Sequence, residues 1–547
     1  MSSVSPEELG VLKKCVSKVG KGRTVVAACI YGSRAAGYAR PDSDVDILIV
    51  LENYPYLVKY IYMSEQEMEV SALIVDRKSL ERDAQGGLLG EFVIGRLLHV
   101  YEPIIGSEFL LRVERIYKRR VILEEVQDIV NSAGILSTEI HFPLEYAAFS
   151  KIKRRMLLYP SATYSYYRTY MAGGRNLKFA LDGYKRALED IVAEDSELFD
   201  RQGDLLRISE KRVLVEKGTA RLKLSKRLQE FSSYFIQTYA GHRIWHLAIK
   251  EAESKIRRHR EQHVNLPDFM SCPKGVYWKL PEGKLIVDSK DWLDDLAKSL
   301  GFGNYSITTK RRLGNVNSRT VLYVIKHDSG EHKIAVKELA KSKAVKWAAL
   351  SVWTVPVKRF KVDPMFRLGS EYLAIRYLRN LGLHVPAIEA IVLDRKLIVT
   401  QYIEGRTLAD VIKGYAKVGD NTGRLRQAGA QMAKIHVAGS SLGNIKPKNI
   451  IVSGSSLYFT DVEQFVFEAG DPAWDLAQFI SWGLKGMRNS QIATKVTSEF
   501  LQGYVQVAGN SNIGRLAKSR RYIESFYPVL APSVARAIKK EIKNLAG

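Results

Sequence analysis

Residues 31–50, YGSRAAGYARPDSDVDILIV, decide how the beginning of this chain folds. Gly32 and Ser33 follow one apolar run, and Asp44 and Asp46 open a second one. The β-branched residues in both runs predict two buried strands joined by a loop. Successive side chains on a strand alternate between its faces, so Asp44 and Asp46 are predicted to point to the same side.

Two carboxylates side by side repel each other unless a cation lies between them. Hard divalent ions with oxygen ligands, Mg²⁺ above all, meet that need, and a pair of them about 4 Å apart can serve both the attacking and the leaving oxygen. Gly32 would let backbone N–H groups approach a phosphate, and the Ser33 hydroxyl adds a donor. The pattern therefore favours phosphoryl or nucleotidyl transfer, with a hairpin carrying solvated aspartates as the alternative.

The Gly-Ser pair followed by DSDVD resembles the signature of the DNA polymerase beta-like nucleotidyltransferase superfamily, over roughly residues 20–105. The resemblance implies Mg²⁺ as cofactor and an NTP, with ATP expected, as substrate. An acceptor hydroxyl or phosphate would attack the α-phosphorus and release pyrophosphate, and catalysis would rest on positioning and charge stabilisation.

The same resemblance implies a third carboxylate on a later strand, for which there are two candidates. Glu69 opens the run EVSALIV and Asp76 follows its end, and their separation of seven residues places them on opposite faces. The resemblance favours Glu69 as the third catalytic and metal-binding acid. Arg34 and Arg40 would either pair with the triphosphate or belong to the plain surface.

The rest of residues 1–105 is predicted to be α/β. A helix is expected at 5–19, a helical stretch between VDILIV and EVSALIVD, and a further helix after the latter strand.

Residues 106–265 carry apolar residues at helical spacing, including 174–195 and 221–260, and predict a basic helical domain. The chain has 83 Lys and Arg against 59 Asp and Glu, a net charge of +24, which favours a polyanionic partner. We expect RNA, with tRNA as one candidate. The tyrosines of 164–170 would either stack on unpaired bases or pack between helices.

A second set of motifs lies beyond the turn-forming residues 265–275. Lys337 ends a strand, Glu371 lies early on a helix, and Asn449 and Asp461 flank two later strands. A Lys–Glu pair with an Asn and an Asp to hold metal is the set of side chains that kinases use for phosphoryl transfer.

Residues of about 300–530 therefore resemble a protein-kinase-like domain, close to the small atypical kinases of archaea and to aminoglycoside or choline kinases. YIEG (402–405), GDPAWDLAQF (470–479) and the basic segment 358–372 carry this resemblance. It implies ATP binding through Lys337 and Glu371, and an archaeal source.

Two positions depart from the kinase pattern. The expected catalytic-loop aspartate is Asn444, and an amide cannot accept the proton of a substrate hydroxyl as a carboxylate does. The glycine-rich loop holds one glycine, Gly314. The domain is either a pseudokinase that binds ATP or a kinase with an altered base, for which Glu463 is a candidate.

These patterns predict a multidomain α/β protein: a small nucleotidyltransferase sheet with helices (1–105), a basic helical domain (106–265), a linker or the start of the kinase-like region (266–300), and a bilobal protein-kinase-like fold (301–547). The predicted function is Mg²⁺-dependent transfer of NMP to an acceptor, RNA foremost and protein as a variant. A kinase of RNA or protein and a non-enzymatic RNA-binding assembly protein are the alternatives. Three scattered cysteines and no long apolar run predict a cytoplasmic protein without a membrane span.

Overall fold

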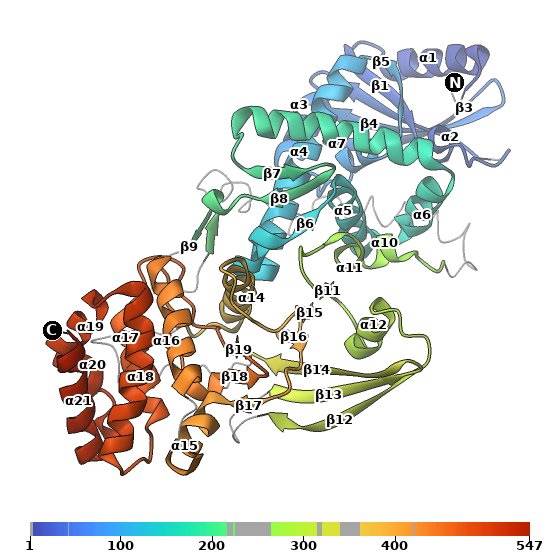
Figure 1. Cartoon of the computed structure of the whole chain (residues 1–547). Coiled ribbons are helices and arrows are strands. Elements are labelled where there is room, and N and C mark those ends of the chain that lie inside the picture. The colour runs from blue at the N-terminus through green and yellow to red at the C-terminus, as the bar shows by residue number, and fades with distance from the viewer. Residues whose placement is uncertain are drawn as a thin grey trace. The chain divides into compact units, whose positions relative to one another are not determined.

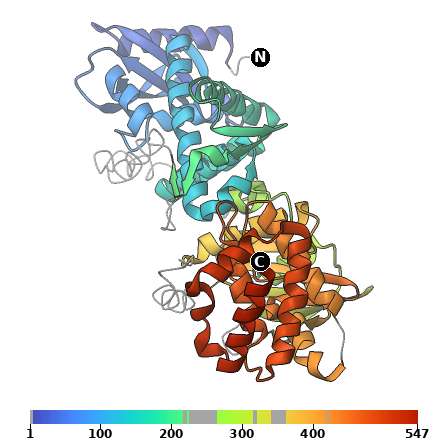
Figure 2. The ribbon, with the colours of Figure 1, turned by 60° about the vertical axis from the view of Figure 1, so that its left-hand side comes forward.

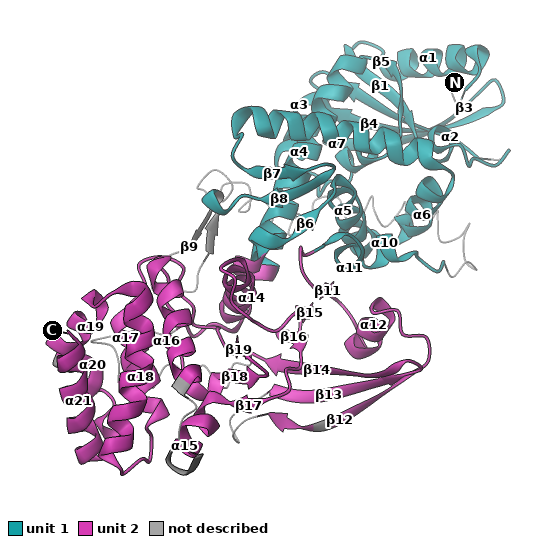
Figure 3. Cartoon of the chain, viewed as in Figure 1, with its two compact units in different colours: residues 1–132, 137–214, 223–279 teal, residues 133–136, 215–222, 280–547 magenta. Residues whose placement is uncertain are grey.

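The computed structural model describes residues 4–41, 43–215, 222–224, 264–313, 320–339, 361–418 and 422–546. It divides into two compact units, shown in separate colours in Figure 3. The first comprises residues 1–132, 137–214 and 223–279, and the second comprises residues 133–136, 215–222 and 280–547. The predicted four-part division of the chain stays a prediction.

The first unit begins with a five-stranded sheet in the order β3-β4-β2-β1-β5, in which β4 runs parallel to β2 and the other neighbours are antiparallel. Its elements are α1 (Pro6–Val19), β1 (Val25–Tyr31), α2 (Gly32–Ala36), β2 (Val45–Leu51), β3 (Val58–Glu65), β4 (Met68–Asp76), α3 (Arg77–Gly86), η1 (Ile94–Leu98) and β5 (Glu102–Ile105). The strands predicted around the Gly-Ser and Asp-x-Asp residues are present as β1 and β2.

The helical stretch expected between β2 and β4 is wrong, because this segment forms the edge strand β3. Tyr60 and Tyr62 alternate along β3 with Ile61 and Met63, whose side chains pack against the core. The β3–β4 hairpin closes through two residues at positive φ, Gln66 at 50° and Glu67 at 64°. Neither is the glycine or asparagine that normally marks such a turn, so the sequence hides it.

Four long or medium helices follow the sheet: α4 (Ser107–Ala133), α5 (Leu144–Leu158), α6 (Thr163–Met171) and α7 (Gly174–Glu194). Helices α4 and α7 lie side by side in Figures 1 and 2, and Arg115–Asp190 and Arg119–Glu194 ion pairs join them. Tyr166 and Tyr170 of α6 are buried, as the packing alternative predicts.

A small sheet in the order β6-β8-β7 interrupts this mostly helical part, which the helical prediction did not contain. Its strands are β6 (His141–Phe142), β7 (Phe199–Gln202) and β8 (Leu205–Ile208); η2 (Gly134–Glu139), η3 (Pro160–Ala162), η4 (Glu210–Arg212), β9 (Val213–Val215), β10 (Leu222–Leu224), α10 (Asp268–Ser271) and α11 (Pro273–Tyr277) complete the chain to residue 279. The helix predicted at 221–260 falls almost wholly outside the described residues.

A buried ionic cluster ties the sheet part of this unit to its helices. Glu91 accepts hydrogen bonds from Lys151 at 2.6 Å and from Arg120 at 2.7 Å, and Lys151 also reaches Glu124 at 2.8 Å. All four side chains are buried. Charges removed from water are stable only when paired, so the three elements that contribute them are held in one arrangement.

The second unit contains a six-stranded sheet in the order β11-β15-β16-β14-β13-β12 and a three-stranded sheet β17-β18-β19. Its elements are β11 (Lys284–Ile286), α12 (Trp292–Ser299), β12 (Tyr305–Leu313), β13 (Thr320–His327), β14 (Gly330–Glu338), α14 (Pro364–Asn380), β15 (Ile388–Val392), β16 (Leu397–Gln401), β17 (Arg406–Thr407), α15 (Leu408–Val418), α16 (Thr422–Val437), η6 (Pro447–Asn449), β18 (Ile450–Ser453), β19 (Ser456–Phe459), α17 (Pro472–Gly483), α18 (Ser490–Ala508), α19 (Ser511–Lys518), α20 (Arg520–Glu524), η7 (Tyr527–Val529) and α21 (Pro532–Ala546).

Within this unit, one part is built around the six-stranded sheet and the other consists mainly of the helices from α15 onward, as Figure 1 shows. Helix α16 packs on α18, and α18 packs on α21. The hairpin predicted around residues 328–330 is present, with His327 opposite Gly330. The predicted multidomain α/β class is confirmed. No helix in the described ranges is both long and apolar enough to cross a membrane.

Candidate functional site

Gly32 lies where the chain leaves β1 and enters the short helix α2. Its φ is +76°, and a Cβ built on it would lie 2.4 Å from Oδ2 of Asp46. Both the backbone conformation and the close approach of the carboxylate therefore require glycine. Tyr31 pairs with Asp46 across β1 and β2, so the sheet register places the Asp46 carboxylate against the start of α2.

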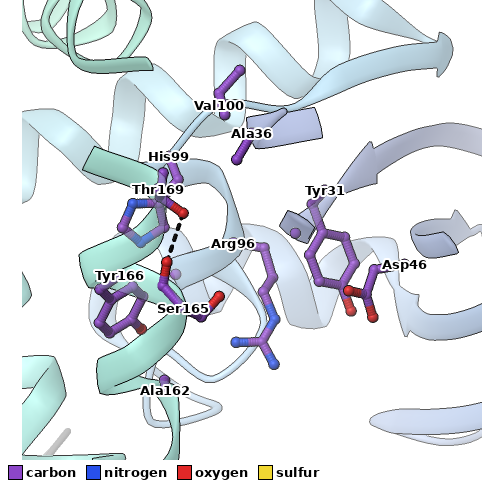
Figure 4. Close-up of a pocket in the computed structure, with 12 residues that line it drawn as sticks. Tyr31, Ala36, Asp46, Arg96, His99, Val100, Ala162, Ser165, Tyr166 and Thr169 are labelled. Atoms are coloured by element: carbon purple, nitrogen blue, oxygen red, sulfur yellow. Dashed lines mark hydrogen bonds between the residues drawn. The ribbon is translucent and has the colours of Figure 1, made fainter. Parts of the chain in front are cut away.

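A pocket in the first unit opens beside this contact (Figure 4). Its empty volume is about 520 Å³ when the open solvent at its mouth is included. The sheet side contributes Tyr31, Gly32, Ala36 and Asp46; the other residues come from η1 with its following turn and from the α6 region, namely Gly95, Arg96, His99, Val100, Ala162, Ser165, Tyr166 and Thr169.

Asp44 lies one residue before β2, two positions from Asp46, as predicted. Glu69 lies at the exposed start of β4, and Asp76 lies at the other end of that strand, opposite Leu51. Asp76 caps α3 by accepting a hydrogen bond from Ser79 N at 3.1 Å, and it also accepts one from Tyr54 N at 3.0 Å. Its place and its bonds indicate a structural residue, which leaves Glu69 as the candidate third acid.

Among the residues that the structure describes, no three His, Cys, Asp or Glu side chains lie close enough together to hold a metal ion by themselves. Mg²⁺ is usually held by one or two carboxylates, water and substrate phosphates rather than by a complete protein cage. The oxygen donors of Asp44 and Asp46 fit that mode. The contribution of Glu69 stays a prediction.

The neighbouring predicted residues have mainly local contacts. Ser33 accepts a hydrogen bond at its carbonyl from Tyr38 N at 3.0 Å. Arg34 lies 3.5 Å from Glu8 and donates to the Ser43 carbonyl at 3.4 Å. The backbone N–H of Arg40 donates to the Ser43 hydroxyl at 3.0 Å. Arg34 and Arg40 are thus part of the structure of the loop before β2, and their role toward a phosphate stays a prediction.

The sequence did not predict two residues of this pocket: Arg96, a cation in η1, and His99, an imidazole in the turn that follows η1. Arg96 lines the same pocket as Asp46, its guanidinium 4.8 Å from the Phe92 ring centroid and 5.5 Å from that of Tyr31, whose ring lies between Arg96 and Asp46 in Figure 4. His99 lines the same pocket, and its Nδ1 lies 2.9 Å from the Tyr170 hydroxyl. They belong to IGRLLH, a segment without a motif, and only the fold brings them to Asp46.

The second unit brings together the predicted kinase-like side chains. Lys337, on β14, donates to Glu371 of α14 at 2.7 Å and lies 3.3 Å from Glu463; it also bonds Asp461. Burial alone would lower the pKa of Lys337, but the three carboxylates outweigh it and raise that pKa. Burial also raises the pKa of Glu371 to about 7, against the opposing effect of Lys337. The ammonium group of Lys337 is thus paired with three carboxylates, those of Glu371, Asp461 and Glu463.

Asn449, directly before β18, and Asp461, two residues after β19, contact each other. The Asn449 amide donates to Asp461 Oδ2 at 3.2 Å, and Asp461 has a φ of +58°. A non-glycine residue in the left-handed region is strained, and such strain gathers at ligand sites. An amide oxygen and a carboxylate fit Mg²⁺ held together with a nucleotide. Gly314 lies outside the described residues.

Asn444 occupies the position of the expected catalytic base. It is buried, and its Oδ1 accepts a hydrogen bond from Gln478 at 3.4 Å. The adjoining loop is fixed by Asp475, a buried carboxylate that accepts from Leu442 N at 2.5 Å and Gly443 N at 2.8 Å. These bonds indicate that Asp475 is a structural residue.

Glu463, the other candidate for the missing base, lies inside the ionic cluster. Its side chain is 2% exposed and accepts a hydrogen bond from Arg367 at 3.0 Å, with Lys337 on its other side. A general base must reach the proton that it removes. Glu463 is buried and paired with Lys337 and Arg367, so it is not placed to act as the general base.

Comparison with known families supports the assignment of the N-terminal region. Residues 13–101 match the family described as "Polymerase beta, Nucleotidyltransferase". This range includes Gly32, Asp44, Asp46 and both candidates for the third acid.

The chain is also similar to a curated protein and to several solved structures. The chain is 23% identical over 150 residues, 27% of its length and 68% of the relative, to the KEOPS complex subunit Bud32 of Pyrococcus abyssi. Solved structures with similarity to the chain include a choline/ethanolamine kinase family protein of Mesorhizobium loti (14% identity, 46% of this chain and 97% of that chain, TM-score 0.29) and a spectinomycin phosphotransferase with ADP and spectinomycin (11%, 46% and 98%, TM-score 0.26). A third is WaaP in complex with acyl carrier protein (13%, 44% and 98%, TM-score 0.25).

These TM-scores are too low to support an argument about fold or substrate, so the kinase-like assignment rests on the side chains around Lys337. The nucleotidyltransferase assignment rests on the matched range and on the Gly32–Asp46 contact. The predicted combination of a polymerase beta-like nucleotidyltransferase domain with a kinase-like region in one chain is thereby confirmed.

Proposed function

We propose that this chain is a Mg²⁺-dependent nucleotidyltransferase that transfers NMP from an NTP, ATP foremost, to RNA, with tRNA or a tRNA-like molecule as the first acceptor to test. The observation that carries the proposal is the Asp46 carboxylate held against Gly32 on the wall of a pocket that also contains Arg96. Opposite charges in one pocket suit a metal-bound polyphosphate, because the acid binds the metal and the guanidinium binds phosphate.

In the proposed reaction the oxygen of an acceptor hydroxyl bonds to the α-phosphorus, the bond to the β-phosphate breaks, and the hydroxyl proton passes to water as pyrophosphate leaves. When bound, Mg²⁺ would neutralise the charge that develops on the phosphates. Asp44 and Asp46 would hold it, with Glu69 as the third acid. Arg96 would hold the phosphates, and the narrow approach at Gly32 fixes where the Asp46 carboxylate lies.

The proposal of RNA as acceptor rests on the charge of the chain. A surplus of 24 positive charges steers a polyanion toward the protein at a rate that falls with salt. A protein side chain as acceptor is the variant to test beside it.

The deciding experiment incubates the chain with Mg²⁺, total RNA and each α-³²P-labelled NTP. We expect label in RNA, lost in D46N and in D44N. D76N is the matched control: Asp76 is on the strand next to Asp46 but at its far end, so this variant should still label RNA. If no NTP labels RNA or added protein while RNA is bound, the chain is a non-enzymatic RNA-binding protein and the proposal is wrong.

A second candidate function is supported by the Lys337–Glu371 and Asn449–Asp461 pairs: a kinase of RNA or protein. Transfer of γ-³²P that disappears in D461N would establish it. Asn444 argues against it, because the amide cannot accept the hydroxyl proton. We therefore expect no γ-transfer by the natural chain, and a first measurable transfer or ATP hydrolysis in N444D.

A further inference from the structure

The pocket beside Asp46 has two walls of different chemistry. Asp46 and Arg96 supply its charged side, and Figure 4 shows Arg96 standing between Asp46 and the side chains of α6. The remaining polar side chains carry no formal charge as hydroxyls or as a neutral imidazole: Ser165, Tyr166, Thr169 and His99. A ligand that fills this pocket would have an anionic end and an uncharged, polar end.

The imidazole of His99 is neutral for a physical reason. Burial holds its pKa well below the ordinary histidine value, and the positive charges of Arg155, Lys118 and Arg96 act in the same direction. The His99 ring packs against Tyr166 with ring centroids 4.7 Å apart, and Nδ1 is bonded to the Tyr170 hydroxyl. The ring is thus fixed on two sides and offers no charge to a phosphate.

The second ring nitrogen of His99 has an unmet hydrogen bond. Nε2 is buried, and no group in the described residues donates to it or accepts from it. Buried polar atoms without a partner are rare and unfavourable, and a ligand group of matching polarity would relieve the deficit. Because His99 lines the pocket, such a ligand would occupy the uncharged wall.

Resting on the proposed nucleotidyl transfer, we propose that the wall formed by His99 and α6 binds the nucleoside part of the NTP, with His99 Nε2 hydrogen-bonded to a polar edge of the base or sugar. The phosphates then lie toward Arg96 and Asp46. His99 is by this assignment a residue that determines which nucleotide is accepted.

The test compares two ligands that share the phosphates but differ in the nucleoside. Dissociation constants of the four NTPs and of inorganic tripolyphosphate are measured with Mg²⁺ for the full chain, for H99F and for H99Q. Removing one hydrogen-bonding atom should weaken the preferred NTP about tenfold and reduce the preference among the four bases. Tripolyphosphate should bind within twofold of the natural chain.

H141F serves as the matched control, because His141 is a second histidine of the same unit whose Nδ1 bonds the Glu139 carbonyl, and it is not among the pocket residues. It should change neither ligand. H99Q keeps a polar side chain at this position, so it provides a second variant if H99F does not fold. Thermal melting is recorded for both variants to show that they are folded.

Equal weakening of NTP and tripolyphosphate in folded H99F or H99Q would overturn the proposal, and so would NTP binding with unchanged affinity and base preference in both. A natural chain that binds NTP in this selective way but labels no acceptor would contradict the transfer function while leaving the nucleoside site intact. A natural chain that binds neither ligand would refute both.

Discussion

Gly32→Ala isolates the contact on which the first site depends. Gly32 and Gly37 lie at the two ends of α2 with almost the same φ, +76° and +77°. Alanine in this left-handed region costs about 1–2 kcal/mol at either position. A Cβ on Gly37 would meet nothing within 4 Å, whereas one on Gly32 would lie 2.4 Å from Asp46 Oδ2. Gly37→Ala is therefore the matched control for backbone strain.

The Gly32 Cβ must displace the Asp46 carboxylate. Ordinary contacts begin at 3.4 Å, so the difference from 2.4 Å is a shift of about 1 Å. A 1 Å misplacement in an active site can reduce the rate about 100-fold. We expect G32A to lose about 100-fold in kcat for nucleotide incorporation relative to G37A, with similar melting temperatures. Activity of G32A within twofold of G37A would refute the assignment of Asp46 as a reacting-site residue.

Three further predictions concern buried charges. R155K should raise the NTP dissociation constant about tenfold, because Arg155 positions the pocket residue Tyr166 by donating to its hydroxyl at 3.0 Å and to the Glu91 carbonyl at 2.7 Å. R120K disturbs the same Glu91 but not Tyr166, so it should lower the stability of the chain without changing its NTP affinity. E91Q should cost about 3–5 kcal/mol at pH 7 by denaturant unfolding. Burial alone would raise the pKa of Glu91, but Lys151, Arg120 and Arg155 outweigh it and lower that pKa, so the contribution is complete above the ordinary glutamate pKa and should shrink as the pH falls below about 4. D475N should destabilise the chain by about 2–4 kcal/mol in the same assay, because one carbonyl oxygen replaces two acceptors that hold the Leu442–Gly443 backbone; an equally stable D475N would contradict its structural role.

The sequence predicted the parts of the first site that follow from strand geometry and missed those that depend on tertiary packing. Strand alternation predicted that Asp44 and Asp46 point to one side, and of the two only Asp46 lies within β2, so their common face stays a prediction. The seven-residue interval predicted that Glu69 and Asp76 are separated, and the structure places them at opposite ends of β4. Arg96 reaches the pocket only because η1 folds beside the sheet, and no local pattern shows that.

The missed strand β3 has a different cause. Its alternation of Tyr60 and Tyr62 with Ile61 and Met63 was visible in the sequence and is typical of a half-buried strand. The turn that joins it to β4 was not visible, because Gln66 and Glu67 adopt positive φ without the residues that favour it.

The kinase-like centre shows why finding a motif does not establish a reaction. The resemblance to kinases pointed to Lys337, Glu371, Asn449 and Asp461, and the structure joins them through Lys337–Glu371, Asn449–Asp461 and Lys337–Asp461 hydrogen bonds. These side chains suit the binding of a nucleotide and a metal ion, which requires charges and oxygen donors. Transfer also requires a proton acceptor within reach of the substrate.

No such acceptor is visible at the position where the kinase pattern requires one. The side-chain oxygen Oδ1 of Asn444 accepts a hydrogen bond from Gln478, and Glu463 lies buried between Arg367 and Lys337. The first unit, by contrast, needs no dedicated base if water accepts the hydroxyl proton, because positioning and charge stabilisation supply most of the rate in phosphoryl chemistry. Asp44 and Asp46 are both present at the first site, whereas Asn444 stands where the kinase pattern requires a carboxylate, so α-phosphate label in the acceptor without γ-phosphate label is the pattern that we expect from the whole chain.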